Sequence, residues 1–102
     1  MIPEDLSIKT IEKIYRQIRP YVNITPLIKA NKFIDNTFNS KIFLKYECFQ
    51  KSGSFKARGA INNILSSDEK DLENGITAVS AGNHAIAASY AANIFNLKNK
   101  IF

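Results

Sequence analysis

Residues 47–59, which read ECFQKSGSFKARG, carry the clearest local signal in this chain. A Ser-Gly-Ser turn at positions 52–54 precedes a segment with helical spacing, so we expect Lys56 just inside the N-terminus of a helix. The positive end of a helix disfavours another positive charge and therefore favours the neutral, nucleophilic amine. Such a lysine can form an imine with a carbonyl compound. Lysines on helices are most often solvated surface residues, so a second signal is needed.

The second signal is the turn SAGNHA at residues 80–85, which joins an apolar strand pattern to a helical one. Amide groups left unpaired at a helix N-terminus bind anions, and Gly82 allows a ligand to approach the backbone. Ser80 and Asn83 can add side-chain hydrogen bonds. We expect His84 to contribute its backbone amide rather than to act as a general acid or base. Because ordinary capping turns have the same composition, the turn alone leaves a purely structural role open.

The apolar pattern along the chain predicts helices that alternate with strands. Helices are expected at residues 6–21, 31–38, 54–65 and 84–95, and strands at 41–47, 76–79 and from 100 onwards, with an extended segment at 25–28. Ser7 can cap the first helix, and Pro20 marks its end. The order strand–helix–strand–helix–strand is typical of an α/β domain with a parallel sheet.

Several side chains have an expected place in the packing. On the second helix, Phe33, Ile34 and Phe38 are expected to face inward. The many alanines of the last helix would let it approach a sheet closely, and close packing would explain Gly59 within the helix at 54–65. Cys48 is the single cysteine, so it can form neither an internal disulfide nor a metal-binding cluster. We expect it to be a small buried hydrophobe.

The formal net charge of +5 raises the question of nucleic-acid binding. The cations are eleven lysines and three arginines, scattered without a basic stripe, so we expect no nucleic-acid partner. No apolar run has the length of a membrane span, and residues 1–5 are acidic, unlike a signal peptide. We therefore expect no membrane partner and a cytoplasmic location. A chain of 102 residues suffices for one small domain at most.

The run SFKARG at 54–59, with Glu47 and Gln50 before it, resembles the lysine motif of threonine dehydratases and serine racemases. These are pyridoxal 5'-phosphate (PLP) enzymes of the tryptophan-synthase-β-like family, also called fold type II. The SAGNHA turn and a Thr-Pro-Leu at residues 25–27 match the family in the same order. The resemblance implies the α/β fold of that family, three layers around a parallel sheet, in incomplete form.

The resemblance also implies roles for individual residues. Lys56 would be the catalytic lysine, and Phe55, Lys56 and Asn83 would contact PLP. Four residues of the SAGNHA turn would bind the substrate carboxylate: Ser80, Gly82, Asn83 and His84. No metal site is implied.

The activity implied by the resemblance is PLP-dependent dehydration and deamination of a hydroxy amino acid. The foremost case is the lyase reaction from L-threonine to 2-oxobutanoate and ammonia, the entry to isoleucine biosynthesis. Ala57 follows the lysine here, whereas the cysteine-synthase and threonine-synthase branches typically place an aspartate there. Ala81 has no exchangeable proton, whereas serine racemases commonly carry a serine that does, so racemisation is disfavoured. Ile86 departs from the family, which usually has glutamine at this position.

Other interpretations stay open. Within the family, the chain could be part of a serine dehydratase or a serine racemase. In a different class, it would be a non-catalytic remnant that at most binds a partner chain. A small α/β module that binds an anion is the third hypothesis.

The resemblance finally bears on how much of an enzyme is present. Family members are longer, so we expect residues 1–102 to be the N-terminal portion of one PLP-enzyme domain. Residues 1–22 would be its N-terminal helix region, and residues 23–102 would be the start of its catalytic α/β region. The four glycines are isolated, without the glycine-rich phosphate loop of the family, so this piece alone is expected to bind PLP poorly. The full-length protein would be a homo-oligomer that acts on an amino-acid substrate.

Overall fold

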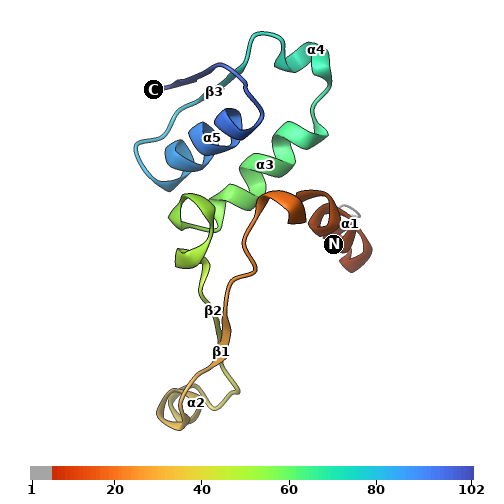
Figure 1. Ribbon diagram of the computed structural model, residues 1–102. Coiled ribbons are helices and arrows are strands. Elements are labelled where there is room, and N and C mark those ends of the chain that lie inside the picture. Colours follow the sequence, from red (N-terminus) through yellow and green to blue (C-terminus); the bar gives the residue numbers. More distant parts are fainter. Residues whose placement is uncertain (1–5) are drawn as a thin grey trace.

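The computed structural model describes residues 6–102 as helices that alternate with short strands (Figure 1). The helices are α1 (Ile8–Ile18), α2 (Lys32–Phe38), α3 (Lys56–Ser66), α4 (Glu69–Leu72) and α5 (Asn83–Ile94). The strands are β1 (Leu27–Lys29), β2 (Phe43–Lys45), β3 (Ile76–Ala78) and β4 (Asn99–Ile101). Three 3-10 turns are η2 (Arg19–Tyr21), η3 (Glu47–Phe49) and η4 (Lys51–Gly53). The acidic start, on which the prediction about a signal peptide rests, lies outside the described residues.

The first helix has the boundaries that its capping residues predict. The Ser7 hydroxyl accepts a hydrogen bond from the backbone N–H of Thr10, which is the usual N-cap interaction. The helix gives way to the η2 turn at Pro20, a residue that lacks the N–H needed to continue an α-helix. Ile18 is buried against α3, while Ile8 and Ile11 remain exposed. The prediction of an amphipathic helix on the domain surface is therefore confirmed.

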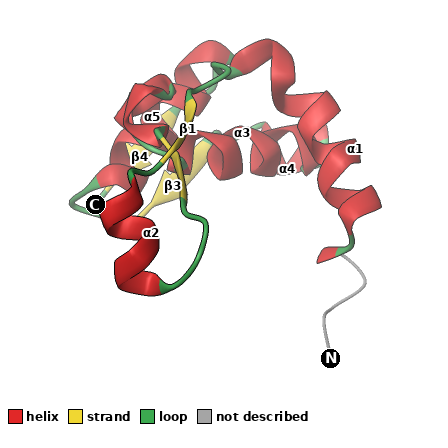
Figure 2. Cartoon of the chain, turned by 90° about the horizontal axis from the view of Figure 1, so that it is seen from below, coloured by secondary structure: helices red, strands yellow, loops and turns green. Residues whose placement is uncertain are grey.

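The hydrophobic core lies between α1, α3 and α5. Its buried members are Ile18, Ala57, Ile61, Ile64 and Ala91. The four buried alanines of α5 leave room for close approach, as predicted, and they are Ala87, Ala88, Ala91 and Ala92. The most extensive contact of α5 is with helix α3 rather than with a sheet, although α5 also packs on β3 and β4 (Figure 2). A small side chain allows close approach whichever element lies opposite, so the pattern could not identify the partner.

The strands form two separate pairs. Strands β3 and β4 are parallel, with Ile76 opposite Asn99 and Ala78 opposite Ile101, and α5 is the connection between them. This confirms the predicted parallel pairing at the end of the chain. Strand β2 is instead antiparallel to β1 and forms a two-stranded ribbon with it. The strand predicted at 41–47 is therefore shorter than expected and lies outside the parallel sheet.

The β1–β2 ribbon and helix α2 project from the helical part as an arm (Figure 1). The arm helps to give the chain an elongated shape, with extents of 52 × 30 × 26 Å. Phe33 and Phe38 of α2 are 78% and 67% exposed, so the prediction that they face inward is wrong. Within the described residues no second layer covers the ribbon and its helix, and Ile34 is only half-buried.

Two further packing predictions are wrong. A Cβ atom added to Gly59 would meet nothing within 4 Å, so close packing does not explain this glycine. Cys48 is exposed, because it lies in the η3 turn at the surface rather than on a core-facing element. As for membranes, the described part of the chain contains no helix with the length and apolar character to cross a bilayer.

Candidate active site

The loop between β2 and α3 reverses direction through two consecutive left-handed residues. Ser52 has φ 60° and Gly53 has φ 76°, after which Ser54 returns to an extended conformation. Ser54 is 7% exposed, and its hydroxyl accepts a long hydrogen bond, 3.4 Å, from the Lys56 backbone N–H. The helix therefore begins at Lys56, close to the predicted start near Ser54.

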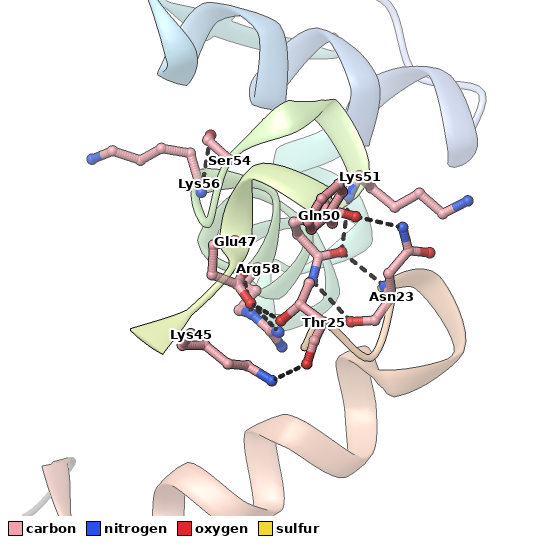
Figure 3. A network of polar contacts seen from close by, with 10 residues as sticks. Asn23, Thr25, Lys45, Glu47, Gln50, Lys51, Ser54, Lys56 and Arg58 are labelled. Carbon is pink, nitrogen blue, oxygen red and sulfur yellow. Dashed lines mark hydrogen bonds and ion pairs between the residues drawn. The ribbon is translucent and has the colours of Figure 1, made fainter. Parts of the chain in front are cut away.

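Gln50 attaches this loop to the segment that precedes β1. Its side-chain oxygen accepts hydrogen bonds from the backbone N–H groups of Asn23, at 2.8 Å, and Lys51, at 2.9 Å. Its side-chain nitrogen donates to the Asn23 carbonyl at 2.9 Å. Because Gln50 is only 4% exposed, these contacts replace the water that an amide group would otherwise bind (Figure 3).

Glu47 and Arg58 join the η3 turn to the first turn of α3, and Thr25 links the pair to the segment that precedes β1. The guanidinium of Arg58 donates two hydrogen bonds, Nε to Oε2 at 2.9 Å and Nη2 to Oε1 at 2.8 Å, in a bidentate pair. The hydroxyl of Thr25 donates to Glu47 Oε1 at 2.6 Å, and the Lys45 ammonium donates to the Thr25 carbonyl at 2.8 Å. Thr25 itself is 4% exposed. The start of α3 is thus held to the entry of β1 and the exit of β2.

Electrostatics at this pair favour the ionised carboxylate. The hydrogen bonds from Arg58 are the main cause, with the Thr25 hydroxyl adding to them and burial opposing, and together they lower the pKa of Glu47 from 4.5 to about 2. The hydrogen bonds to Glu47 in turn raise the pKa of Arg58. Both side chains of the pair are therefore ionised throughout the physiological pH range.

Lys56 lies on the other side of the first turn of α3, and its side chain extends away from the Glu47–Arg58 pair (Figure 3). The lysine is exposed, and its ammonium lies 5.3 Å from the centroid of the Phe55 ring. A groove of about 280 Å³ opens here. Its lining residues come from α3 and its N-cap and from the start of α5: Phe55, Lys56, Gly59, Ala60, Asn63 and His84.

The turn at residues 80–83 leads from β3 into α5. The hydroxyl of Ser80 accepts a 3.2 Å hydrogen bond from the Gly82 N–H, so this amide already has a partner. Asn83 and His84 are the first two residues of α5 and are exposed. An added Cβ at Gly82 would meet nothing within 4 Å, which leaves the backbone open on that side.

The structure thus brings some of the predicted site residues into one place. Phe55, Lys56 and His84 line the same groove, while Ser80, Gly82 and Asn83 lie beside it at the start of α5 without lining it. Asn63 was not predicted, and its sequence context carries no signal for it. The bridging contacts of Thr25 and Gln50 were also missed, although both residues belong to the motifs quoted for the family.

Comparison with known proteins identifies the class that this fold and groove define. The profile of the pyridoxal-phosphate dependent enzyme family matches residues 18–102, and the chain belongs to that family. The fold is therefore part of the α/β fold of the type II PLP enzymes, and PLP is the cofactor of the family, as predicted.

The similar proteins include a threonine dehydratase and serine racemases. The chain is 43% identical to the L-threonine dehydratase biosynthetic IlvA of Staphylococcus saprophyticus over 97 residues, covering 95% of this chain and 23% of the relative. It is 40% identical to a serine racemase of Oryza sativa subsp. indica, covering 86% and 26%. The structure of maize serine racemase superimposes with a TM-score of 0.80 at 39% identity, covering 92% and 29%. The chain thus spans about a quarter of the length of these curated relatives.

The described residues can be tested against PLP itself. The groove offers an exposed primary amine at Lys56 and an aromatic ring at Phe55, which suit the aldehyde and the ring of the cofactor. The phosphate is not provided for in the same way, because the four glycines of the sequence are isolated from one another. The residues therefore fit the reactive end of the cofactor.

Proposed function

We propose that this chain is part of a PLP-dependent lyase that dehydrates and deaminates L-threonine to 2-oxobutanoate and ammonia. The observation that carries the proposal is the shared groove of about 280 Å³, which Lys56 and the start of α5 at His84 line together. The 43% identity to an L-threonine dehydratase supports the substrate.

Each residue has a defined role in the proposal. PLP, when bound, supplies an electron sink for the pair of electrons left on the α-carbon. Lys56 holds the cofactor covalently through Nζ and moves the α-proton of the substrate. Phe55 and Asn83 orient the cofactor ring. The substrate carboxylate is bound at the N-terminus of α5, where the first-turn amides and the helix dipole attract an anion, by four residues: Ser80, Gly82, Asn83 and His84. Gly82, whose N–H is bonded to the Ser80 hydroxyl, contributes a backbone that no side chain covers.

Ala81 supports dehydration over racemisation. It is an exposed methyl side chain in the turn before α5, and it has no proton to exchange with a substrate. Racemisation needs a proton donor on each face of the α-carbon, whereas elimination of water uses the lysine face alone. A serine racemase is the second candidate function, favoured by the 40% identity to the rice enzyme.

The two candidates differ in their products. The intact protein that contains these residues, given L-threonine and PLP, is expected to release 2-oxobutanoate, measured as its hydrazone. L-Serine should give less 2-oxo acid and no D-serine on chiral chromatography. Lys56→Arg should abolish product, while Lys51→Arg, on an exposed lysine of the same loop, should not. D-Serine from the wild-type protein, or product from Lys56→Arg, would overturn the proposal.

A further inference from the structure

We propose that Glu47 and Arg58 are positioning residues for Lys56: their bidentate pair fixes the rotation of the first turn of α3, so that the lysine enters the groove shared with His84. This inference rests on the proposed function of Lys56 and adds a specific role for two residues that do not line that groove.

The geometry of a helix gives the pair its leverage on Lys56. Successive residues turn by about 100°, so Lys56 and Arg58 point to nearly opposite sides of α3. Arg58 anchors one side to Glu47, and Lys56 is presented on the other (Figure 3). A planar guanidinium held at two atoms fixes an orientation, which a single hydrogen bond or a point charge does not.

Besides the pair, this turn is held by two backbone hydrogen bonds, from Ala57 N–H to Ser54 C=O at 3.5 Å and from Arg58 N–H to Phe55 C=O at 3.1 Å, and by few side-chain contacts. The N-cap residue Phe55 makes no side-chain capping bond, and the hydrogen bond from the Lys56 N–H to Ser54 is long, at 3.4 Å. Ala57, between the two charged residues, is fully buried, but one methyl group resists rotation weakly. The bidentate pair is therefore the strongest polar side-chain restraint on the direction in which Lys56 points.

The far end of the pair is itself rigid. Glu47 Oε1 also accepts the Thr25 hydroxyl, and Thr25 is buried at the entry of the β1–β2 ribbon. The other ion pair within residues 6–102 joins Glu12 to Arg16 on α1, at 4.0 Å and exposed to solvent. A surface pair of that kind contributes little, so it provides a matched control.

The experiment measures where PLP attaches when the lysine is misdirected. The intact protein that contains these residues is incubated with PLP, reduced with borohydride and digested, and the share of pyridoxyl label on Lys56 is compared with that on the other ten lysines of residues 1–102. Arg58→Lys keeps the charge and loses the two-point contact. Ile64→Val trims the core at the other end of α3 and controls for a general loss of stability. Glu12→Gln removes the surface pair.

The labelling is done at a temperature at which circular dichroism shows that all variants are folded. There, Arg58→Lys is expected to lower the Lys56 share about tenfold, while Ile64→Val and Glu12→Gln leave it unchanged. The positioning role would be overturned, and the proposed function left standing, if Arg58→Lys had the same share of label on Lys56 as the wild type. An equal fall of that share in Ile64→Val would have the same consequence. A wild-type chain without label on Lys56 would overturn both.

Discussion

Lys56 of α3 and His84 of α5 line one groove. Each lies at the start of its helix, and the turns that precede the two helices differ. The turn before Lys56 uses two left-handed residues, and the turn before His84 uses a serine hydroxyl bonded to a glycine amide. The two helices meet through the small side chains of α5. The site therefore depends on how α3 is held, and the first two predictions test those restraints.

The Glu47 carboxylate should make the chain sensitive to acid. Its pKa is lowered from 4.5 to about 2 in the folded state, so its stabilising effect is complete above about pH 4.5 and is lost as the pH falls towards 2. Urea unfolding between pH 6 and pH 2 should show a loss of up to about 2 kcal/mol from this group, allowing for solvent screening. In Glu47→Gln that part of the pH dependence should disappear. Equal pH dependence in both proteins would contradict the assignment.

Gln50 should be among the most sensitive polar residues of the chain. Gln50→Ala would leave the backbone N–H and C=O of Asn23 without their partners in a part-buried loop. We expect a loss of about 2 kcal/mol in the free energy of unfolding, measured by urea titration. Gln17→Ala, at an exposed position on α1, is the matched control and should change stability by no more than about 0.5 kcal/mol. Similar losses at both positions would show that the Gln50 contacts are not formed.

Two glycines should respond in opposite directions to the same substitution. Gly59→Ala places a methyl group in open space within a helix and should stabilise by about 0.5–1 kcal/mol. Gly75→Ala requires a side chain at φ +82°, and its Cβ would collide with the backbone of Lys98. Thermal unfolding should therefore show a higher midpoint for the first variant and a clearly lower one for the second. A lower midpoint for Gly59→Ala would point to a tightly packed neighbour after all.

Local sequence signals predicted most of the elements. Ser7 and Pro20 mark the two ends of the first helix because capping and the missing proline N–H act on neighbouring residues. The strand patterns near 76 and 100 predict the parallel pair because a helix connects them, as in other α/β units. Apolar periodicity shows which side chains prefer burial, but not what covers them. The prediction for Phe33 and Phe38 was wrong for this reason. Both lie on an arm that has no second layer within residues 6–102, so they stay exposed.

The site was predictable only in part. The family motifs identified Lys56 and the turn at residues 80–85, but spacing along the chain could not show which of them share a groove. The contact of Gln50 with Asn23 and that of Glu47 with Thr25 and Arg58 join distant segments. Such contacts depend on how the β1–β2 ribbon places its two ends, which no local pattern encodes. The antiparallel pairing of β2 with β1 is likewise a contact between separate segments, and it places β2 outside the predicted parallel sheet.

The attachment point of PLP is the most direct measurement of the central proposal. The intact protein is saturated with PLP, reduced with borohydride, weighed by mass spectrometry and mapped by peptide. We expect one pyridoxyl group per chain on Lys56, none after Lys56→Arg, and an unchanged result after Lys51→Arg. Label spread evenly over the lysines, or the same label in Lys56→Arg as in the wild type, would contradict the assignment of Lys56 as the cofactor lysine.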